Sequence, residues 1–154
     1  MHLEREKQEA LRAPLRESLQ KNGLRVYVEK AVNLAAADSN GFSDPYVVLS
    51  LYTPNMDKRV AKVKSKVIKK NLNPIWEEML TLTHTSYNDL IVKVEVWDKD
   101  KITDDFLGQI VWPFEEIFKK VLDKGEVVMP FALKDKKGGN TAQGEVYLKF
   151  VFKS

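Results

Sequence analysis

Apolar and polar side chains alternate one by one along much of the chain between residues 24 and 152. Successive side chains of a β-strand point to opposite faces of a sheet, so each alternating segment predicts a strand with one buried face. The clearest such segments are residues 24–29, 46–51, 61–67, 92–97 and 145–152. Further strands are expected at residues 78–83, 108–112 and 126–133. This pattern predicts an all-β protein, an eight-stranded antiparallel β-sandwich.

Two segments depart from the period of two. Residues 2–21 have the composition of a helix, with opposite charges at helical spacing, and Asn22-Gly23 ends the segment. Pro14 is expected to kink or divide this helix, because proline lacks a backbone N–H and its ring crowds the preceding turn. A short helix is expected with Pro113 in its first turn, because apolar residues then recur at helical spacing, namely Phe114, Ile117, Phe118 and Val121.

These elements predict an N-terminal helical extension or linker at residues 1–22 and a single β domain at residues 23–154. The first helix has an apolar stripe formed by Leu11, Leu15 and Leu19. This stripe is expected to pack on the domain, to pair with a helix of a partner protein, or to continue an upstream linker. The sequence leaves these three arrangements open.

The composition excludes several kinds of protein and site. The 154-residue chain has no cysteine, which rules out a disulfide framework and thiolate chemistry. The N-terminus is too charged for a signal peptide and no apolar run approaches the length of a membrane span, so we expect a cytoplasmic protein or a domain of a larger one. A hydrolase with paired carboxylates is disfavoured, because His2 and His84 are the only histidines and no nucleophile motif accompanies them.

Aspartates are concentrated in two segments, although the chain carries a formal net charge of +3. Asp38 and Asp44 lie between the first two predicted strands, and four aspartates lie within residues 98–105. Carboxylates this dense repel one another, and Ca²⁺, which takes about six to eight oxygen ligands, removes the repulsion. The alternative is that Asp44 belongs to an Asp-Pro turn and that Asp104 and Asp105 cap another turn.

The second aspartate segment does not match the calcium loop of an EF-hand. A loop that starts at Asp98 has Ile102 at its fifth position and Thr103, rather than glycine, at its sixth. Its twelfth position is Gln109, where an EF-hand has a bidentate glutamate. The EF-hand interpretation of this segment therefore fails at three positions.

Residues 57–70 contain seven Lys or Arg residues and a single Asp. Strand alternation places Lys62, Lys64 and Lys66 on one face, opposite Val63 and Val67. This face is either an ordinary solvated strand face that deters edge aggregation or a patch that attracts anionic lipid. Nucleic acid is not expected as a partner, because no aromatic–basic RNA motif accompanies the lysines.

Two apolar residues lie inside the aspartate segments. Phe42 lies between Asp38 and Asp44, and Ile102 lies in the middle of residues 98–105. Apolar side chains that flank a cation site favour shallow insertion into a membrane surface, whereas the alternative is that Phe42 folds back onto the domain.

Three motifs resemble, in order and spacing, the signature segments of C2 domains, the membrane-targeting module named from protein kinase C. They are SDPYVVLSLY at residues 43–52, KSKVIKKNLNPIWEE at 64–78 and VWDKDKITDDFLGQ at 96–109. The resemblance covers residues 23–153. It implies the C2 fold, and the strand-like C-terminal segment makes the chain similar to the second of two circularly permuted forms, as in phospholipase C isoforms and HECT-class ubiquitin ligases.

In C2 domains, acidic side chains from two loops hold two or three Ca²⁺ ions. Matched position by position, the resemblance implies five ligands in this chain: Asp38, Asp44, Asp98, Asp100 and Asp105. The segment from Asp98 to Gly108 is one residue shorter than in well-known calcium-binding members. Asp104 therefore remains an alternative to Asp105, Thr103 remains a possible further ligand, and a third ion stays open beside the two expected.

The resemblance also implies lipid partners. Lys62 and Lys64 match a lysine cluster that binds phosphatidylinositol bisphosphate, and Tyr46 and Trp97 match aromatic residues that flank the headgroup. The expected function is Ca²⁺-dependent binding to anionic membranes that contain phosphatidylserine and phosphoinositides, with recruitment when calcium rises. The alternative is a calcium-independent C2 domain that docks a protein or a lipid through the sandwich faces or the N-terminal helix.

Overall fold

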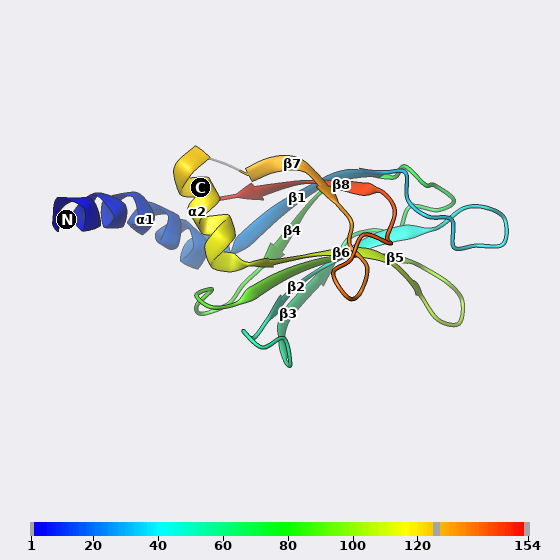
Figure 1. The fold of residues 1–154 in the computed structure, drawn as a ribbon, viewed down its shortest axis with the longest axis horizontal. Helices are drawn as coiled ribbons and strands as arrows, with labels where there is room; N and C mark the ends of the chain where they lie inside the picture. The colour runs from blue at the N-terminus through cyan, green and yellow to red at the C-terminus, as the bar shows by residue number, and fades with distance from the viewer. Residues whose placement is uncertain (1, 125–126, 153–154) are drawn as a thin grey trace.

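The computed structural model describes residues 2–124 and 127–152 of the chain. Two antiparallel four-stranded sheets form a β-sandwich, which confirms the predicted all-β fold (Figure 1). One sheet has the strand order β4-β1-β8-β7 and the other has the order β3-β2-β5-β6. The strands are β1 (Leu24–Val32), β2 (Pro45–Tyr52), β3 (Arg59–Lys64), β4 (Ile75–Leu82), β5 (Ile91–Asp98), β6 (Asp105–Pro113), β7 (Val127–Ala132) and β8 (Glu145–Val151).

The predicted boundaries differ from the observed ones at a few places. The strand expected at residues 61–67 ends at Lys64, because the next residue, Ser65, turns inward and its hydroxyl accepts the Val47 N–H at 2.8 Å. Pro113 is the last residue of β6 rather than the first of the following helix. Met1, Gly125, Glu126, Lys153 and Ser154, which the predicted segments included, lie outside the described residues.

The core lies between the two sheets and follows the alternation of each strand. The inward side chains of β1, β5 and β8 are almost fully buried, as in Val26, Val94 and Leu148. The central strand β2 departs from the expectation of one buried face, because its outward residues Tyr46 and Val48 are also buried. Lys64 of the neighbouring strand β3 contributes to this burial, since its Nζ lies 5.8 Å from the Tyr46 ring centroid.

The C-terminal strand β8 lies between β1 and β7 and pairs antiparallel with both. The pairing places Val26 opposite Phe150 and Val28 opposite Leu148, so that apolar residues from both ends of the domain meet in the core. The segment after residue 144 is therefore an internal part of the sandwich and not a tail.

The N-terminal segment forms one continuous helix, α1 (His2–Asn22), so the expectation that Pro14 divides it is wrong. Contacts on both sides of Pro14 hold the helix in register against α2 (Phe114–Lys124). Before the proline, the Arg12 guanidinium lies 2.9 Å from the Glu115 carboxylate and 5.3 Å from the Phe118 ring centroid. After it, Leu19 is buried in the core. These contacts compensate for the hydrogen bond that proline removes.

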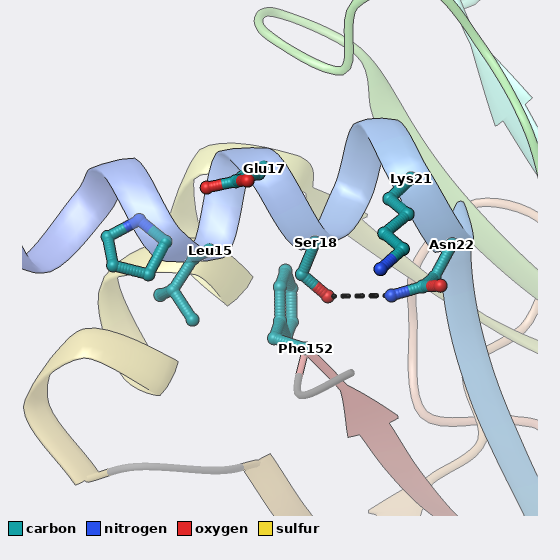
Figure 2. Close-up of a pocket in the computed structure, with 7 residues that line it drawn as sticks. Leu15, Glu17, Ser18, Lys21, Asn22 and Phe152 are labelled. Atoms are coloured by element: carbon teal, nitrogen blue, oxygen red, sulfur yellow. Dashed lines mark hydrogen bonds between the residues drawn. The ribbon is translucent and has the colours of Figure 1, made fainter.

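A groove of about 560 Å³ runs where α1 meets the end of β8. Pro14, Leu15, Ser18 and Phe152 line it, and Asn22 Nδ2 donates to Ser18 Oγ at 3.4 Å beside the Phe152 ring (Figure 2). The stripe of the helix that the sequence left unassigned thus packs partly on the domain, although Leu11 remains 55% exposed.

The aspartate loops lie at the end of the sandwich away from both helices (Figure 1). Residues 33–44 connect β1 to β2 and residues 99–104 connect β5 to β6. Within the described residues, no helix is both long and apolar enough to cross a lipid bilayer.

The packing of α1 on the domain can be tested by truncating its buried leucine. Leu19 is 5% exposed, so Leu19→Ala is expected to lower the free energy of unfolding by about 2–4 kcal/mol through lost burial and a residual cavity. Leu3→Ala, at a position 71% exposed in the same helix, is the matched control and is expected to change it by less than about 0.5 kcal/mol. Urea denaturation measures both; equal effects would show that α1 does not pack on the domain in solution.

Candidate cation site and basic groove

The pairing of β2 with β5 brings the two aspartate segments together. Pro45, the first residue of β2, lies opposite Asp98, the last residue of β5. Asp38 and Asp44, from the loop that leads into β2, therefore reach the same place as Asp98. One carboxylate oxygen from each of the three lies within 4.8 Å of the others.

Asp98 is the most constrained of these residues. Its side chain is fully buried, and its Oδ1 accepts the Asp44 backbone N–H at 2.6 Å. Its Oδ2 is also buried, and no group within residues 2–124 and 127–152 donates a hydrogen bond to it. Burial raises the pKa of Asp98 to about 6; the Asp44 N–H opposes this rise, and the carboxylates of Asp38 and Asp44 add to it.

This donor set fits a hard divalent cation. A buried carboxylate oxygen without a donor is costly in an apolar environment, and the carboxylates of Asp38 and Asp44 lie beside it. Ca²⁺ takes oxygen ligands of this kind and would satisfy the buried Oδ2 of Asp98 while relieving the repulsion. Asp38, Asp44 and Asp98 are the residues placed to hold it.

The first loop is held in shape by its own hydrogen bonds. The buried Ser43 hydroxyl donates to the Ala35 carbonyl at 2.8 Å and accepts the Ala37 N–H at 3.0 Å. The Asp38 N–H donates to the Phe42 carbonyl at 2.8 Å, which closes a tight turn between them. The loop therefore presents Asp38 and Asp44 from a defined backbone rather than from a free chain.

The loop between β3 and β4, residues 65–74, also touches the site. The Lys70 N–H donates to Asp44 Oδ1 at 2.7 Å, and the Asn71 N–H donates to the Ser43 carbonyl at 2.9 Å. The sequence did not indicate a role for this loop in the aspartate cluster. The NLNP motif at residues 71–74 marks a turn, but its partner depends on long-range packing.

The other two predicted ligands lie close by but outside the three-carboxylate cluster. Asp105 is the direct cross-strand neighbour of Asp98 in the β5–β6 ladder, and paired residues of this kind share one face of a sheet. Asp100 is exposed, and its Oδ1 accepts the Lys101 N–H at 2.6 Å. Of the five predicted calcium ligands, the structure brings three together in one cluster and places Asp105 next to Asp98. Asp100 lies outside the cluster.

Asp104, the alternative to Asp105, lies on the other side of the loop. Its carboxylate accepts a hydrogen bond from the Tyr46 hydroxyl and another from the Asp100 N–H at 3.0 Å. The Asp100 N–H, followed by the Tyr46 hydroxyl, lowers the pKa of Asp104 below its usual range. Burial, together with the hydrogen bond to Asp104, raises the pKa of Tyr46.

Tyr46 and Asp104 form part of a basic groove of about 600 Å³ on the outer face of the second sheet. The predicted lipid residues Lys62, Lys64 and Trp97 line this groove as well, with Lys64 Nζ 5.8 Å from the Tyr46 ring centroid. Burial and the nearby charges of Arg59 and Lys64 lower the pKa of Lys62. The structure therefore brings four of the five predicted lipid residues to one concave surface.

Several groove residues were not singled out from the sequence. They are Tyr52, Arg59, Lys99 and Glu95. Thr103 and Ile102 line the same groove; they belong to the third loop, by which we mean the β5–β6 connection, residues 99–104, with the strand ends Asp98 and Asp105 that flank it. Alternation along β5 would have predicted that Glu95, which lies between the core residues Val94 and Val96, faces the outer side of the sheet. Glu95 is buried and lies 3.7 Å from Lys93 Nζ, so the groove contains acidic as well as basic side chains.

The remaining predicted residues lie apart from the groove or at the loop tips. Lys66 follows the end of β3, where its N–H donates to Glu78 at 3.0 Å and its carbonyl accepts the Trp76 indole N–H at 3.1 Å. Phe42 is 44% exposed and Ile102 is 95% exposed. Both apolar side chains belong to the loops that carry the aspartates, and Phe42 does not fold back into the core.

Removal of the Asp98 charge is expected to stabilise the metal-free protein. Because the folded state raises the pKa of Asp98 to about 6, its ionisation opposes folding, and stability falls as pH rises through that value. Asp98→Asn keeps an acceptor for the Asp44 N–H and should raise the free energy of unfolding by about 1–3 kcal/mol near neutral pH in a chelator. The gain should shrink toward pH ~4, where the carboxyl is largely protonated in the folded state.

Urea denaturation with a chelator at both pH values measures this effect. Asp123→Asn, an exposed aspartate of α2, is the control for charge alone and is expected to change stability by less than about 0.5 kcal/mol. A lower free energy of unfolding for Asp98→Asn at neutral pH would contradict the inference that ionisation of Asp98 opposes folding.

Comparison with known proteins places this geometry in a family. Residues 22–130 match the C2 domain family. The chain is 38% identical over 107 residues to the eye isozyme of protein kinase C from Drosophila melanogaster, an alignment that covers 68% of this chain and 15% of the kinase. The chain thus spans a small part of such relatives.

Solved structures agree with this assignment. A single C2 domain of a plant extended synaptotagmin 1 superposes with a TM-score of 0.64 at 20% identity, covering 84% of this chain and 92% of that one. The calcium-bound pair of C2 domains of extended synaptotagmin 2 superposes with a TM-score of 0.63 at 26% identity, covering 82% of this chain and 44% of that one. The chain belongs to the C2 domain family.

Proposed function

We propose that this domain binds Ca²⁺ and, when calcium is bound, attaches to membranes that contain anionic phospholipid. The observation that carries the proposal is the cluster of Asp38, Asp44 and Asp98, with a buried Asp98 oxygen that lacks a hydrogen-bond donor within the described residues. The calcium-bound extended synaptotagmin 2 structure, similar in fold to this chain, supports the choice of cation.

Two calcium ions are proposed, with Asp100 and Asp105 adding ligands from the third loop. Asp105 supports this because it pairs with Asp98 across the β5–β6 ladder. Bound Ca²⁺ supplies positive charge at the loop end, where aspartates otherwise repel acidic lipid, and accepts oxygen ligands from phosphate groups. Because lipid and protein would share the ions, calcium affinity and membrane affinity are reciprocally linked.

The basic groove is proposed to bind the headgroup of a phosphoinositide. Lys62 and Lys64 extend from β3 into a concavity whose walls include Tyr46 and Trp97. Lysines provide mobile ammonium donors for phosphate oxygens, and the aromatic rings provide flat walls against which a headgroup can lie. Lys66 is proposed to contribute only to long-range attraction, because it lies outside this groove.

Phe42 and Ile102 are proposed to enter the membrane surface. Their loops lie together at one end of the sandwich (Figure 1), and Ile102 is almost completely exposed. Burial of an exposed isoleucine in lipid is favourable by roughly 2 kcal/mol. A membrane that meets this end of the domain would contact the cation site and the mouth of the groove together.

A calcium-independent docking function is the second candidate. It is favoured by the groove, whose lysines attract anionic groups whether or not calcium is bound. It is also favoured by α1, where Leu3 and Leu11 are 71% and 55% exposed and available to a partner protein. The two candidates differ in whether membrane binding requires calcium, which the following experiment decides.

Vesicles of phosphatidylcholine, phosphatidylserine and phosphatidylinositol 4,5-bisphosphate are expected to sediment the domain with calcium and much less with a chelator. Asp98→Asn should remove most of the calcium-dependent fraction, because it takes one charge from the cation site but keeps the Asp44 hydrogen bond. Equal sedimentation in calcium and chelator would reject the calcium switch and favour the docking candidate.

The same assay tests the loop tips. Phe42→Ala combined with Ile102→Ala is expected to lower calcium-dependent sedimentation while leaving calcium affinity unchanged, since neither side chain offers an oxygen ligand. Leu11→Ala, an exposed leucine at the far end of the molecule, is the matched control. An equal loss in both proteins would argue against insertion.

The groove lysines are expected to set the salt dependence of binding. Lys62→Ala with Lys64→Ala should weaken binding to inositide vesicles by roughly tenfold or more, at about 1 kcal/mol per cation near an acidic surface. The double variant should also show a flatter dependence on salt, because fewer charges are screened. Lys119→Ala in α2 is the control, and an unchanged salt slope in the double variant would reject the headgroup assignment.

A further inference from the structure

We infer that Asp104 is a residue of the basic groove, where it weakens phosphate binding and occupies the Tyr46 hydroxyl, and that Asp104 is not a ligand of the cation site. The inference deepens the proposed headgroup function of the groove and rests on it. Its starting observation is that two successive aspartates, Asp104 and Asp105, point toward two different surfaces.

The position of Asp104 is defined at both carboxylate oxygens. Oδ2 accepts the Tyr46 hydroxyl, and Oδ1 accepts the Asp100 N–H at 3.0 Å. Lys99 Nζ lies 3.8 Å from Oδ2, and Asp104 lines the groove together with Lys62 and Lys64. Asp104 is not a member of the close cluster of Asp38, Asp44 and Asp98.

Asp105 has the opposite environment. It begins β6 and lies directly across from Asp98, which belongs to that close cluster. Asp104, the residue before β6, instead lines the groove, so the two adjacent aspartates belong to different surfaces. This placement assigns Asp105, rather than Asp104, to the cation site.

An anion inside a cation-lined groove has a direct effect on phosphate. The Asp104 carboxylate offsets positive charge from Lys64 and Lys99 and repels an incoming phosphate group at short range. Hydrogen bonds from the Asp100 N–H and the Tyr46 hydroxyl hold this carboxylate in place inside the groove. The groove is thus less attractive to phosphate than its lysines alone would make it.

The contact with Asp104 also occupies the Tyr46 hydroxyl. A tyrosine hydroxyl carries a single proton, and Tyr46 donates it to Asp104. While this bond is intact, the hydroxyl cannot donate to a phosphate oxygen. A headgroup must either displace Asp104 or bind without this donor, so Asp104 selects against ligands that depend on Tyr46.

Asp104→Asn is the direct test, because it removes the charge and keeps the size of the side chain. Isothermal titration with inositol 1,4,5-trisphosphate in chelator and low salt should show binding about fivefold tighter than in the natural chain. Asp123→Asn removes the same charge from the exposed surface of α2 and should leave the affinity within about twofold.

A double-mutant cycle tests the role of the Tyr46 hydroxyl. Tyr46→Phe is expected to reduce trisphosphate affinity less than about twofold in the natural chain, where the hydroxyl is already engaged. In an Asp104→Ala background, which has no side-chain acceptor at this position, the same change should cost clearly more, because the hydroxyl is then free to donate. Equal costs in the two backgrounds would overturn this part of the inference.

Calcium titration provides a readout that does not need the groove. Asp105→Asn is expected to lower calcium affinity at least about tenfold, whereas Asp104→Asn should change it less than about threefold. Loss of calcium affinity in Asp104→Asn equal to that in Asp105→Asn would make Asp104 a cation ligand and overturn the inference.

The outcomes separate the inference from the proposed function. If the natural chain binds trisphosphate through Lys62 and Lys64 but Asp104→Asn binds no more tightly, the inference alone fails. If neither protein binds trisphosphate, the headgroup function and the restraining role of Asp104 fail together. Tighter binding by Asp104→Asn that is lost on Lys62→Ala and Lys64→Ala supports both.

Discussion

The antiparallel pairing of β2 with β5 is the contact on which the candidate site depends. It sets Pro45 opposite Asp98, which unites the aspartates of two loops, and it sets Tyr46 opposite Trp97, which builds the aromatic wall of the groove. These two pairs are consecutive in the ladder and face opposite sides of the sheet. A shift of one residue in this register would separate the carboxylates and turn the aromatic residues into the core.

The same register gives the domain two charged surfaces of opposite sign at one end. The acidic surface contains a buried carboxylate, Asp98, whose ionisation opposes folding, and its neighbours Asp38 and Asp44 add to that cost. The basic surface contains lysines that share their groove with Glu95 and Asp104. The third loop contributes to both surfaces, since Asp105 lies beside the carboxylate cluster and Asp104 lies in the groove.

The N-terminal helix has a separate structural role. Its second half packs on α2 and on the end of β8, at the far end of the molecule from the aspartate loops (Figure 1). The helix and the aspartate loops therefore lie at opposite ends of the domain (Figure 1).

The sequence determined much of the fold, because strand alternation and helical spacing are local patterns that report which side chains must be buried. The alternation of apolar and polar residues predicted the strands of the two sheets. Three motifs indicated a resemblance to C2 domains, and comparison with known proteins confirms this family. The alternation along residues 46–51 and 92–97 also places Tyr46 and Trp97 on the face opposite the core valines of their segments, and both line one groove in the structure. These inferences needed no knowledge of which segments meet.

The tertiary structure decided what depends on contacts between distant segments. Lys66 lies outside the groove because Ser65 turns inward to bond Val47, and Pro14 is accommodated in one helix because packing holds both of its sides. Asp104 and Asp105 are identical in type and adjacent in sequence, so only the register of β5 against β6 and the position of Tyr46 distinguish them. Local patterns set the orientation of a side chain within its own strand, but the partner that it meets is set by long-range pairing.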